Sequence, residues 1–416
     1  MSFATFNLHP DLLRGLHGLG FSEPTPIQKS AIPPACEGRD ILACAMTGSG
    51  KTAAFMLPIL QRLLGKSRGV TRALVLAPTR ELAAQIDQHR RELGRFVRVT
   101  GAAVYGGVGM EPQETAIRRG VDILVATPGR LLDHLGRPYA RLDGIEVLVL
   151  DEADRMLDMG FLPDIRRIMR ALPATRRQTL LLSATLPPEI TALAREMLRD
   201  PVRIDVERPA APAVGISHAV YPVSPELKLP LLVELLRRPE VRNMLVFTRT
   251  KHRANRLAEG LVRRGVSADR IHGNRSQAQR TQALAAFKAG KTRVLVATDV
   301  AARGIDVTGL SHVVNFDVPK VPDDYIHRVG RTARAGEVGD AVTFVSSEEE
   351  ADLRSIERAV GTRMPRLTVA SFDYTARTAE RLEVPLGERI AAIRARKSDE
   401  RARARANAAR HLTHAR

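Results

Sequence analysis

The sequence predicts an α/β protein built from two tandem domains, each a mostly parallel sheet with helices on both faces. The chain has 416 residues, about twice the length of a typical domain, and 44% of its residues are apolar, enough for two cores. Short Val/Leu/Ile runs alternate with helical patterns such as 81–90 and 251–264 in both halves, as expected for parallel sheets covered by helices.

An internal repeat supports the two-domain prediction. Leu74-Val75 with Thr79 is matched by Leu245-Val246 with Thr250, and the Leu-Val-Ala-Thr segment at 124–127 is matched at 295–298, always 171 residues later. One such coincidence would be weak evidence. Two at the same offset indicate a duplicated domain.

Composition predicts the domain boundaries. We expect a first domain at 1–205, a Pro- and Ala-rich linker at 206–217, a second domain at 218–370 and a basic tail at 371–416. The tail has too few large apolar residues for a core. We favour a loose, sequence-blind RNA tether over its alternative, a solvated charged end.

Charge and cysteine content narrow the function classes. The net charge of +18 points to a nucleic-acid partner, with a basic surface kept for solubility as the alternative. Cys36 and Cys44 lack metal-site spacing and are expected to be ordinary buried thiols in a reducing interior. There is no signal peptide and no run of about 18 apolar residues, so we expect a soluble cytoplasmic protein without a membrane partner.

Residues 45–52 (Ala-Met-Thr-Gly-Ser-Gly-Lys-Thr) predict a phosphate loop. They lie between a short apolar strand at 39–43 and a helical pattern at 51–64, the strand-loop-helix order that phosphate binding requires. Backbone N–H groups of such a loop surround phosphate oxygens, while Lys51 neutralises β/γ charge and Thr52 ligates Mg²⁺. The strict pattern has Gly where Ala45 stands. The candidate phosphate-binding residues are Thr47, Gly48, Ser49, Gly50, Lys51 and Thr52.

The acidic run at 151–154 follows the apolar stretch 145–150. Carboxylates at a strand end can hold the metal and orient water, so loop and acidic run together predict a nucleoside triphosphatase that uses Mg²⁺. A two-metal nuclease could use Asp151, Glu152 and Asp154, but it would not need the phosphate loop.

Asp151-Glu152-Ala153-Asp154 resembles the motif that names the DEAD-box RNA helicases, and the other family motifs follow in order over residues 1–370. They are Phe3, Gly20-Phe21, 24–28, 78–82, Gly106-Gly107, 127–130, 183–185, 246–249, Gln277 with Arg280, 297–306 and 327–334. Two departures, Met46 and Ala333, remove no charged or ligating group. The start at Met1, the compact core and the short basic tail look most like the bacterial RhlE-like branch.

The resemblance implies two RecA-like domains and ATP as the cofactor. The amide of Gln28 has one donor and one acceptor for the N6 and N7 edge of adenine, in a segment that includes Phe21 and Thr25. Phe3 is expected to stack on the base, or alternatively to anchor the first helix. Asp299 resembles a ribose contact.

The resemblance also implies the catalytic and coupling residues. Thr52 and Asp151 would hold Mg²⁺, and Glu152 would position the attacking water. Arg331 and Arg334 would stabilise the transition state from across the cleft after domain closure, although such a charge run could otherwise be a solvated helix face. The coupling residues would be Asp154, Ser183, Thr185, Arg303, His327 and Arg328.

The expected RNA contacts suit phosphate and sugar oxygens, so binding should be independent of sequence. They are Thr79, Arg80, Gly107, Thr127, Arg130, Arg249, Gly273 and Thr298. ATP and RNA together would close the domains, bend one strand and unwind a short duplex. The rivals are an ATP-binding RNA clamp with little turnover and a processive DNA translocase. Ribosomal or RNA-degradation proteins are candidate partners.

Overall fold

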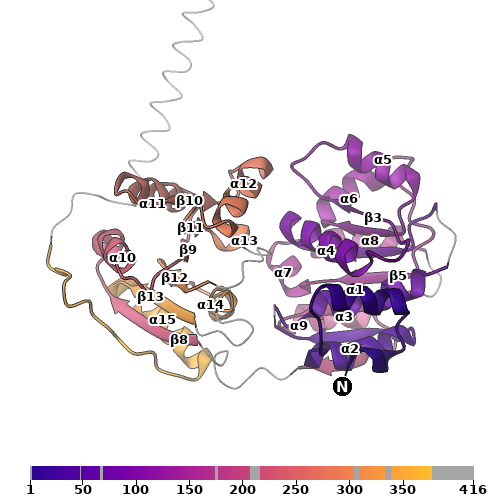
Figure 1. The fold of residues 1–416 in the computed structure, drawn as a ribbon, viewed down its shortest axis with the longest axis horizontal. Helices are drawn as coiled ribbons and strands as arrows, with labels where there is room; N and C mark the ends of the chain where they lie inside the picture. Colours follow the sequence, from indigo (N-terminus) through magenta and orange to yellow (C-terminus); the bar gives the residue numbers. More distant parts are fainter. Residues whose placement is uncertain are drawn as a thin grey trace, which may run out of the picture.

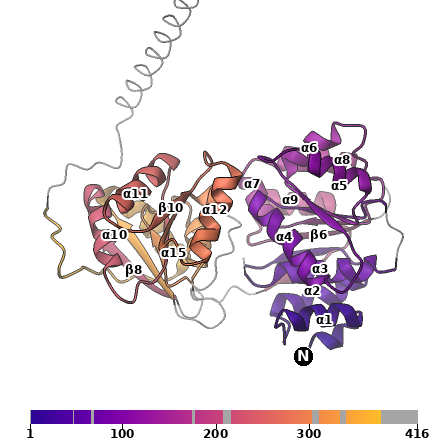
Figure 2. The ribbon, with the colours of Figure 1, turned by 45° about the horizontal axis from the view of Figure 1, so that its top comes forward.

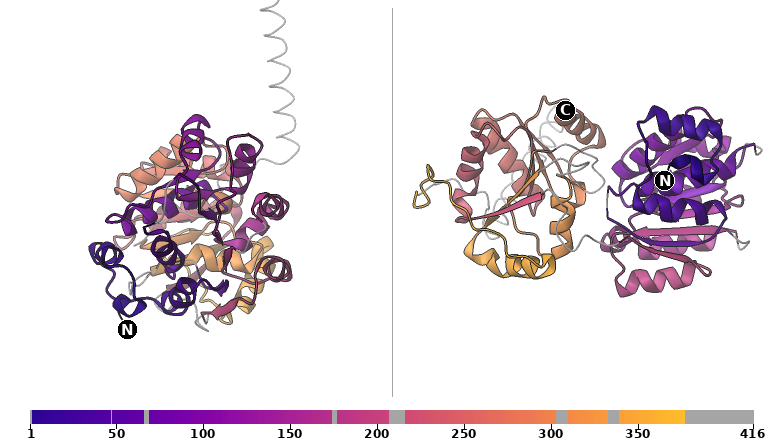
Figure 3. Two further views of the ribbon diagram at one scale, coloured as in Figure 1. Left: turned by 90° about the vertical axis from the view of Figure 1, so that its right-hand side faces the viewer. Right: turned by 60° about the horizontal axis from the view of Figure 1, so that its bottom comes forward.

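A computed structural model describes residues 2–46, 48–65, 69–173, 177–206, 216–302, 310–332 and 339–376. The expected site residues Thr47, Arg303 and Arg334, most of the expected linker and the chain beyond 376 lie outside these ranges. The described residues form two α/β bodies side by side, as Figure 1 and the right-hand view of Figure 3 show. The first body contains the N-terminal half of the chain and the second contains the C-terminal half.

The first domain contains a parallel sheet of seven described strands in the order β3-β4-β2-β5-β6-β1-β7. The strands are β1 (Ile41–Cys44), β2 (Ala73–Leu76), β3 (Gly101–Val104), β4 (Ile123–Ala126), β5 (Val147–Leu150), β6 (Gln178–Ser183) and β7 (Val202–Asp205). The helices are η1 (Phe3–Phe6), α1 (Pro10–Gly18), α2 (Pro26–Cys36), α3 (Lys51–Leu63), α4 (Arg80–Leu93), α5 (Glu111–Arg119), α6 (Pro128–Leu135), α7 (Ala153–Asp158), α8 (Leu162–Ala171) and α9 (Pro188–Met197).

The second domain contains a parallel sheet of six described strands in the order β10-β11-β9-β12-β13-β8. The strands are β8 (Ile216–Pro222), β9 (Met244–Phe247), β10 (Ala268–Ile271), β11 (Val294–Ala297), β12 (His312–Asn315) and β13 (Gly339–Val345). The helices are η2 (Pro225–Leu227), α10 (Lys228–Leu236), α11 (Lys251–Arg263), α12 (Gln277–Lys288), α13 (Asp299–Ala302), α14 (Pro322–Val329), η3 (Ser347–Glu349) and α15 (Glu350–Val360).

Helices cover both faces of each sheet (Figure 2), because the short strands carry apolar residues on both sides. Along β2, Ala73 and Val75 pack into a core with α1 to α4, whereas Leu74 and Leu76 pack into a second core with α6, α8 and α9. In the second domain, α10 and α11 cover one face, and α12 to α15 cover the other. The two-domain α/β prediction is confirmed.

The sequence repeat corresponds to a repeat in space. Leu74 of β2 pairs with Leu124 of β4, and Leu245 of β9 pairs with Leu295 of β11 in the same register. The neighbours also match, since β3-β4-β2-β5 in one sheet corresponds to β10-β11-β9-β12 in the other. The repeated segments therefore occupy equivalent central positions in two copies of one fold.

Two expected boundaries need correction. β8 begins at Ile216, inside the expected linker, because its backbone pairs with β13 from Gly339 onward. The expected tail begins too early, since Phe372 and Tyr374 pack against the core of the second domain. The hydroxyl of Tyr374 also accepts the backbone N–H of Val369 at 3.1 Å.

The cysteine prediction is wrong in one respect. Both thiols are free, but Cys36 is exposed and Cys44 is only half-buried. Cys36 is the last residue of α2, where the chain turns toward solvent before Gly38. None of the helices in the described ranges is both long and apolar enough to cross a membrane.

Candidate active site between the two domains

The predicted site residues of the first domain follow the ends of its strands. The phosphate loop follows β1, Thr79 follows β2, Thr127 follows β4, and Asp151 follows β5. Because the strands are parallel, all these ends lie at the same edge of the sheet, where open α/β sheets bind their ligands. The fold therefore gathers motifs that lie about a hundred residues apart in the chain.

A cavity of about 300 Å³ lies at this edge and is lined by residues of both domains. Lys51, Thr52, Asp151 and Glu152 line it from the first domain, and Arg331 lines it from the second. The phosphate loop also contributes Gly48 and Gly50 to the lining. The segment expected to hold the adenine base contributes Leu19, Phe21 and Gln28, and residues of α4 complete the lining. The arrangement brings a phosphate loop, an acidic pair and an arginine of the second domain to one space.

The phosphate loop needs glycine at two positions. Gly48 and Gly50 have φ angles of 83° and 96°, which side chains rarely adopt. A Cβ on Gly50 would also lie only 2.5 Å from Nε2 of Gln28. Gly50 caps α3, so N–H groups at the start of that helix face the cavity side of the loop.

The polar groups of the loop fit a triphosphate. The Lys51 ammonium is buried and donates to the carbonyl of Ala45 at 2.7 Å. The hydroxyl of Ser49 is buried without a hydrogen-bond partner among the described residues. A buried cation beside an unsatisfied donor and a helix N-terminus suits an anionic ligand.

The acidic pair has an unusual environment. Burial raises the pKa of Asp151 to about 7, against the opposing effect of Lys51. Glu152 is one of the few described non-glycine residues in the left-handed region, with φ 54°, and its backbone N–H donates to Oδ1 of Asp151 at 3.0 Å. Such strain is kept where surrounding contacts enforce it, and it occurs here at Glu152, which lines the cavity together with Asp151.

Asp154 connects the acidic run with β6. Its Oδ2 atom accepts the N–H groups of Ala184 and Thr185 at 3.1 and 2.9 Å and the Thr185 hydroxyl at 3.0 Å. In return, the Asp154 N–H donates to the hydroxyl of Ser183 at 3.1 Å. The predicted coupling residues of the first domain are thus brought together.

The aromatic residues at the base-facing side differ in exposure. Phe21 is 39% exposed and lines the cavity, whereas Phe3 is buried in the core and meets Phe21 edge-on, with 6.3 Å between ring centroids. This favours the anchor interpretation of Phe3. The Gln28 side chain lines the cavity but is already bonded, since it accepts from Thr25 N–H at 2.9 Å and donates to Gly50 at 3.1 Å.

Asp299 does not line the main cavity. Its carboxylate accepts two hydrogen bonds from the Arg328 guanidinium, at 2.6 and 2.8 Å, in a smaller pocket that shares Arg331 with the main cavity. His327 lines the same smaller pocket together with Arg155 of the first domain. The predicted interdomain residues of α14 therefore lie at the domain boundary.

The expected RNA contacts of the first domain gather around the turn at 105–109. The Arg80 guanidinium packs so closely on Gly107 that a Cβ there would lie 1.8 Å from Nη1. Arg130 donates to the carbonyl of Val108 at 3.1 Å. Thr79 and Thr127 precede α4 and α6 and are buried, and the Thr79 hydroxyl accepts the N–H of Leu82.

The expected RNA contacts of the second domain also follow neighbouring strands. Arg249 follows β9, Gly273 follows β10 and Thr298 follows β11, and these three strands are adjacent in the sheet. Arg249 is the long side chain of this group. Its backbone N–H donates to Oδ2 of Asp317 at 2.7 Å, so the Asp317 side chain fixes the backbone position of Arg249.

Sequence reasoning missed the direct contacts between the domains. Arg155 of α7 pairs with Asp324 of α14 at 3.0 Å. Glu81 of α4 accepts from Gln277 at 3.1 Å and pairs with Arg280 at 3.0 Å. Glu81, Gln277 and Arg280 belong to matched sequence motifs, but the motifs do not indicate that the three side chains meet. Arg155 and Asp324 have no comparable sequence signal for their contact.

Gln113 is another residue that sequence reasoning missed. Its amide accepts from Tyr105 N–H at 3.1 Å and donates to the carbonyls of Tyr105 and Gly109 at 3.2 and 3.1 Å. It is buried and clamps the turn that carries Gly107. A lone glutamine on an amphipathic helix gives no sequence signal for this role.

Two RecA-like domains that share a phosphate loop, an acidic strand end and an arginine across one cavity define a helicase-type nucleotide-hydrolysing core. Family models agree: "DEAD/DEAH box helicase" matches residues 25–193, and "Helicase conserved C-terminal domain" matches 227–336. The DEAD-box ATP-dependent RNA helicase CshA of Bacillus subtilis (strain 168) is 41% identical over 393 residues, covering 93% of this chain and 79% of that protein. The chain belongs to the DEAD-box ATP-dependent RNA helicases, enzymes that hydrolyse ATP in dependence on RNA.

Other relatives and solved structures extend the comparison. CshA of Geobacillus kaustophilus (strain HTA426) is 41% identical over 383 residues, covering 92% of this chain and 82% of that protein. S. cerevisiae Dbp5 bound to RNA and ADP BeF3 has a TM-score of 0.81 at 32% identity, covering 88% of this chain and 95% of that one. A Dbp5 variant bound to Nup159, a Gle1 variant, IP6 and ADP has a TM-score of only 0.63 at 31% identity, covering 86% and 95%.

Proposed function

We propose that this chain hydrolyses ATP only when both domains enclose the triphosphate, and that single-stranded RNA bridging the domains favours this state. The observation that carries the proposal is the lining of one cavity by Lys51 and Glu152 of the first domain and Arg331 of the second. Closure would hold one RNA strand in a path that a duplex cannot follow. Unwinding would therefore be local and short.

The cavity residues divide the chemistry among them. Lys51 balances the charge on the β/γ phosphates, and Glu152 positions water. Thr52 and Asp151 offer the hydroxyl and carboxylate oxygens that Mg²⁺ prefers, and a metal there would neutralise phosphate charge. The high pKa of Asp151 fits a site whose charge balance is completed by a bound cation.

Arginines of the second domain would act at the transition state. Phosphoryl transfer spreads negative charge over equatorial oxygens, and a guanidinium brought from a separate body stabilises that charge only after closure. Arg331 and Arg334 are proposed for this role. Phe21 and Gln28 would hold the adenine, whereas Asp299 would act through its ion pair with Arg328 or at the ribose.

RNA would be held by its backbone. The gathered groups are backbone amides, hydroxyls and arginines, which suit phosphate and sugar oxygens and do not read bases. Asp154, Ser183 and Thr185 would transmit the state of the triphosphate to the RNA face of the first domain. Binding should therefore be independent of RNA sequence, and Dbp5 in complex with RNA and ADP BeF3 supports the class of ligand.

The decisive experiment measures the ATPase rate with no nucleic acid, with single-stranded RNA and with DNA of the same length and sequence. We expect RNA to raise the rate about tenfold or more and DNA to raise it far less. Glu152→Gln should still bind ATP and RNA but lose this stimulation, which assigns the rate to this site. Equal stimulation by DNA would support the translocase rival, and tight ATP binding without turnover would support the clamp.

Three finer assignments belong to the same proposal. Membership of the RhlE-like branch remains a proposal from the layout of the motifs, whereas the relatives compared above are CshA proteins. We propose a cytoplasmic location because the expected substrates, ATP and RNA, are found inside cells. Ribosomal or RNA-degradation proteins are proposed as partners because they carry structured RNA.

A further inference from the structure

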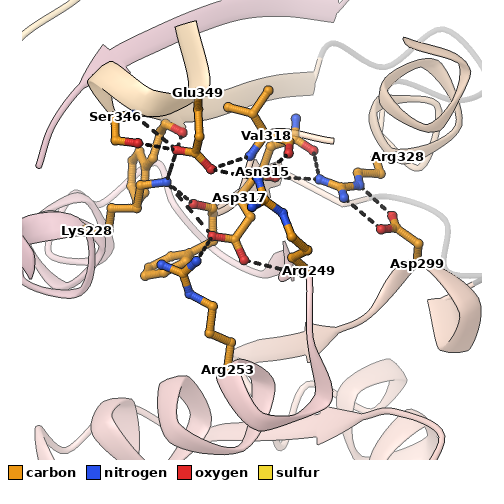
Figure 4. Close-up of polar contacts among 12 residues, drawn as sticks. Lys228, Arg249, Arg253, Asp299, Asn315, Asp317, Val318, Arg328, Ser346 and Glu349 are labelled. Carbon is orange, nitrogen blue, oxygen red and sulfur yellow. Dashed lines mark hydrogen bonds and ion pairs between the residues drawn. The ribbon is translucent and has the colours of Figure 1, made fainter. Parts of the chain in front are cut away.

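A buried polar network surrounds the end of β12 in the second domain (Figure 4). Its centre is the segment 315–318, which is contacted by side chains from α10, α14, η3 and the start of α11. Asn315 and Asp317 are completely buried there. Buried polar groups are costly unless they are paired, so the position of this segment depends on its partners.

Asp317 contacts an arginine on each side. Its Oδ2 atom accepts the backbone N–H of Arg249 at 2.7 Å, and its backbone carbonyl accepts Nη1 of Arg328 at 2.8 Å. Asn315 strengthens the second contact, because its Oδ1 atom accepts from the same Nη1 at 3.0 Å. A single residue thus holds the proposed RNA contact and an arginine of the nucleotide side.

The contacts continue from Arg328 to the nucleotide cavity. The carbonyl of Arg328 accepts the N–H of Arg331 at 3.1 Å, and Arg331 lines the cavity. The Arg328 guanidinium is fixed in addition by the Asp299 carboxylate (Figure 4). Arg249, Asp317, Arg328 and Arg331 therefore form one unbroken path of hydrogen bonds.

Other buried charges prevent the segment from moving alone. Glu349 accepts Val318 N–H at 3.2 Å and the Arg249 guanidinium at 3.4 Å through Oε1, while Lys228 donates to its Oε2 at 2.5 Å. Lys228 also donates to the carbonyl of Phe316 at 2.8 Å. A displacement of the segment would break several of these contacts together.

The charge of Asp317 is matched on its other oxygen. Nη1 of Arg253 lies 2.8 Å from Oδ1, and the Lys228 ammonium lies 3.9 Å from the same atom. Removing one charge from a buried group of this kind leaves the others uncompensated. Asp317 is therefore the residue where a small change should disturb the path most.

We propose that Asp317 is a positioning residue that couples RNA binding at Arg249 to nucleotide binding at Arg328 and Arg331 within the second domain. The inference rests on the proposed function, since it takes Arg249 as an RNA contact. It adds a route inside the second domain to the Asp154–Thr185 link of the first. The alternative is a network that only stabilises the fold.

The two interpretations differ in the coupling factor, the factor by which bound nucleotide tightens RNA binding. By thermodynamic linkage, RNA tightens nucleotide binding by the same factor. A purely stabilising network would change the unfolding midpoint and leave this factor intact. The test measures the Kd of a fluorescent single-stranded RNA with and without ADP–beryllium fluoride, for the full chain and for Asp317→Asn. Asparagine retains an acceptor for Arg249 and removes the charge.

We expect the nucleotide analogue to tighten RNA binding by wild type about tenfold or more. Asp317→Asn should reduce this factor about fivefold, with each ligand alone bound within about threefold of wild type. Glu357→Gln is the matched control, since Glu357 pairs with Arg366 in the same domain but outside the path. Glu357→Gln should lower the stability of the protein and leave the factor by which nucleotide tightens RNA binding unchanged.

If Asp317→Asn does not fold, Asn315→Ala removes the other acceptor of Arg328 Nη1 and should lower the coupling factor about threefold. A folded Asp317→Asn protein, or a folded Asn315→Ala protein in its place, that keeps the wild-type factor would overturn the inference. Wild type that binds no RNA under any condition would contradict the proposed function and this inference with it. RNA binding without any nucleotide effect would contradict the coupling alone.

Discussion

The Asp154 carboxylate accepts both the backbone N–H and the hydroxyl of Thr185 through one oxygen, Oδ2, at 2.9 and 3.0 Å. This joins the acidic end of β5 to the end of β6. Because each neutral donor to a carboxylate contributes on the order of 1.5–3 kcal/mol, loss of the hydroxyl should loosen the joint without unfolding the domain.

We therefore predict that Thr185→Ala retains ATP binding but unwinds about fivefold less duplex per ATP hydrolysed. Thr185→Ser retains the hydroxyl and should be close to wild type. The measurement is the ratio of duplex unwound to phosphate released. Equal ratios in the alanine and serine variants would show that the hydroxyl has no part in coupling.

Gly107 gives a prediction for the RNA side. Its φ of 83° and the contact of Arg80 leave no room for a side chain. Gly107→Ala should therefore raise the RNA concentration needed for half-maximal ATPase activity about tenfold, with little change in ATP affinity. Gly109→Ala is the control in the same turn, because a Cβ there meets only Pro112 at 3.9 Å. Similar effects of both changes would argue against a specific role of Gly107.

We expect the basic tail to affect RNA binding but not the rate of the chemical step. Deletion of residues 377–416 leaves Phe372 and Tyr374 packed on the second domain. A basic tether contributes binding and no transition-state contact, so the KM for RNA should rise several-fold while kcat is kept. An unchanged KM at low salt would favour the solvated charged end.

Three histidines, of which His134 and His272 are buried and His218 is half-buried, should make the protein less stable in mild acid. Burial lowers the pKa values of His134, His218 and His272 below the ordinary 6.5. The unfolded chain therefore takes up protons at a higher pH than the folded chain, so stability is lost as pH falls below about 6.5. Denaturant midpoints should fall between about pH 7.5 and 5.5, and by less in His134→Gln, which removes the proton uptake. An identical pH dependence in that variant would exclude His134 as a contributor.

Local features of the fold could be predicted because they depend on local patterns. The strand at 39–43 and the helix at 51–64 appear as β1 (Ile41–Cys44) and α3 (Lys51–Leu63), since apolar spacing and loop glycines determine such elements. The duplicated segments correspond to paired strands in both sheets. Helicase membership followed from many ordered motifs and is confirmed.

The remainder depends on contacts between distant residues. Arg155 and Asp324 are 169 residues apart, and no periodicity indicates that they meet. Composition alone places the start of β8 in the linker, because its partner β13 comes more than a hundred residues later. The burial of Phe3 and the exposure of Cys36 likewise depend on which surfaces pack together, and single-residue chemistry does not determine this.

The central claim is that one triphosphate is held by both domains, with Arg331 acting from the second. The most direct test is kcat for RNA-stimulated ATP hydrolysis by Arg331→Ala, together with its affinity for ATP in the absence of RNA. We expect kcat to fall about a hundredfold or more while ATP affinity changes less than about threefold, as for a group that acts at the transition state. A variant with wild-type kcat would contradict the claim.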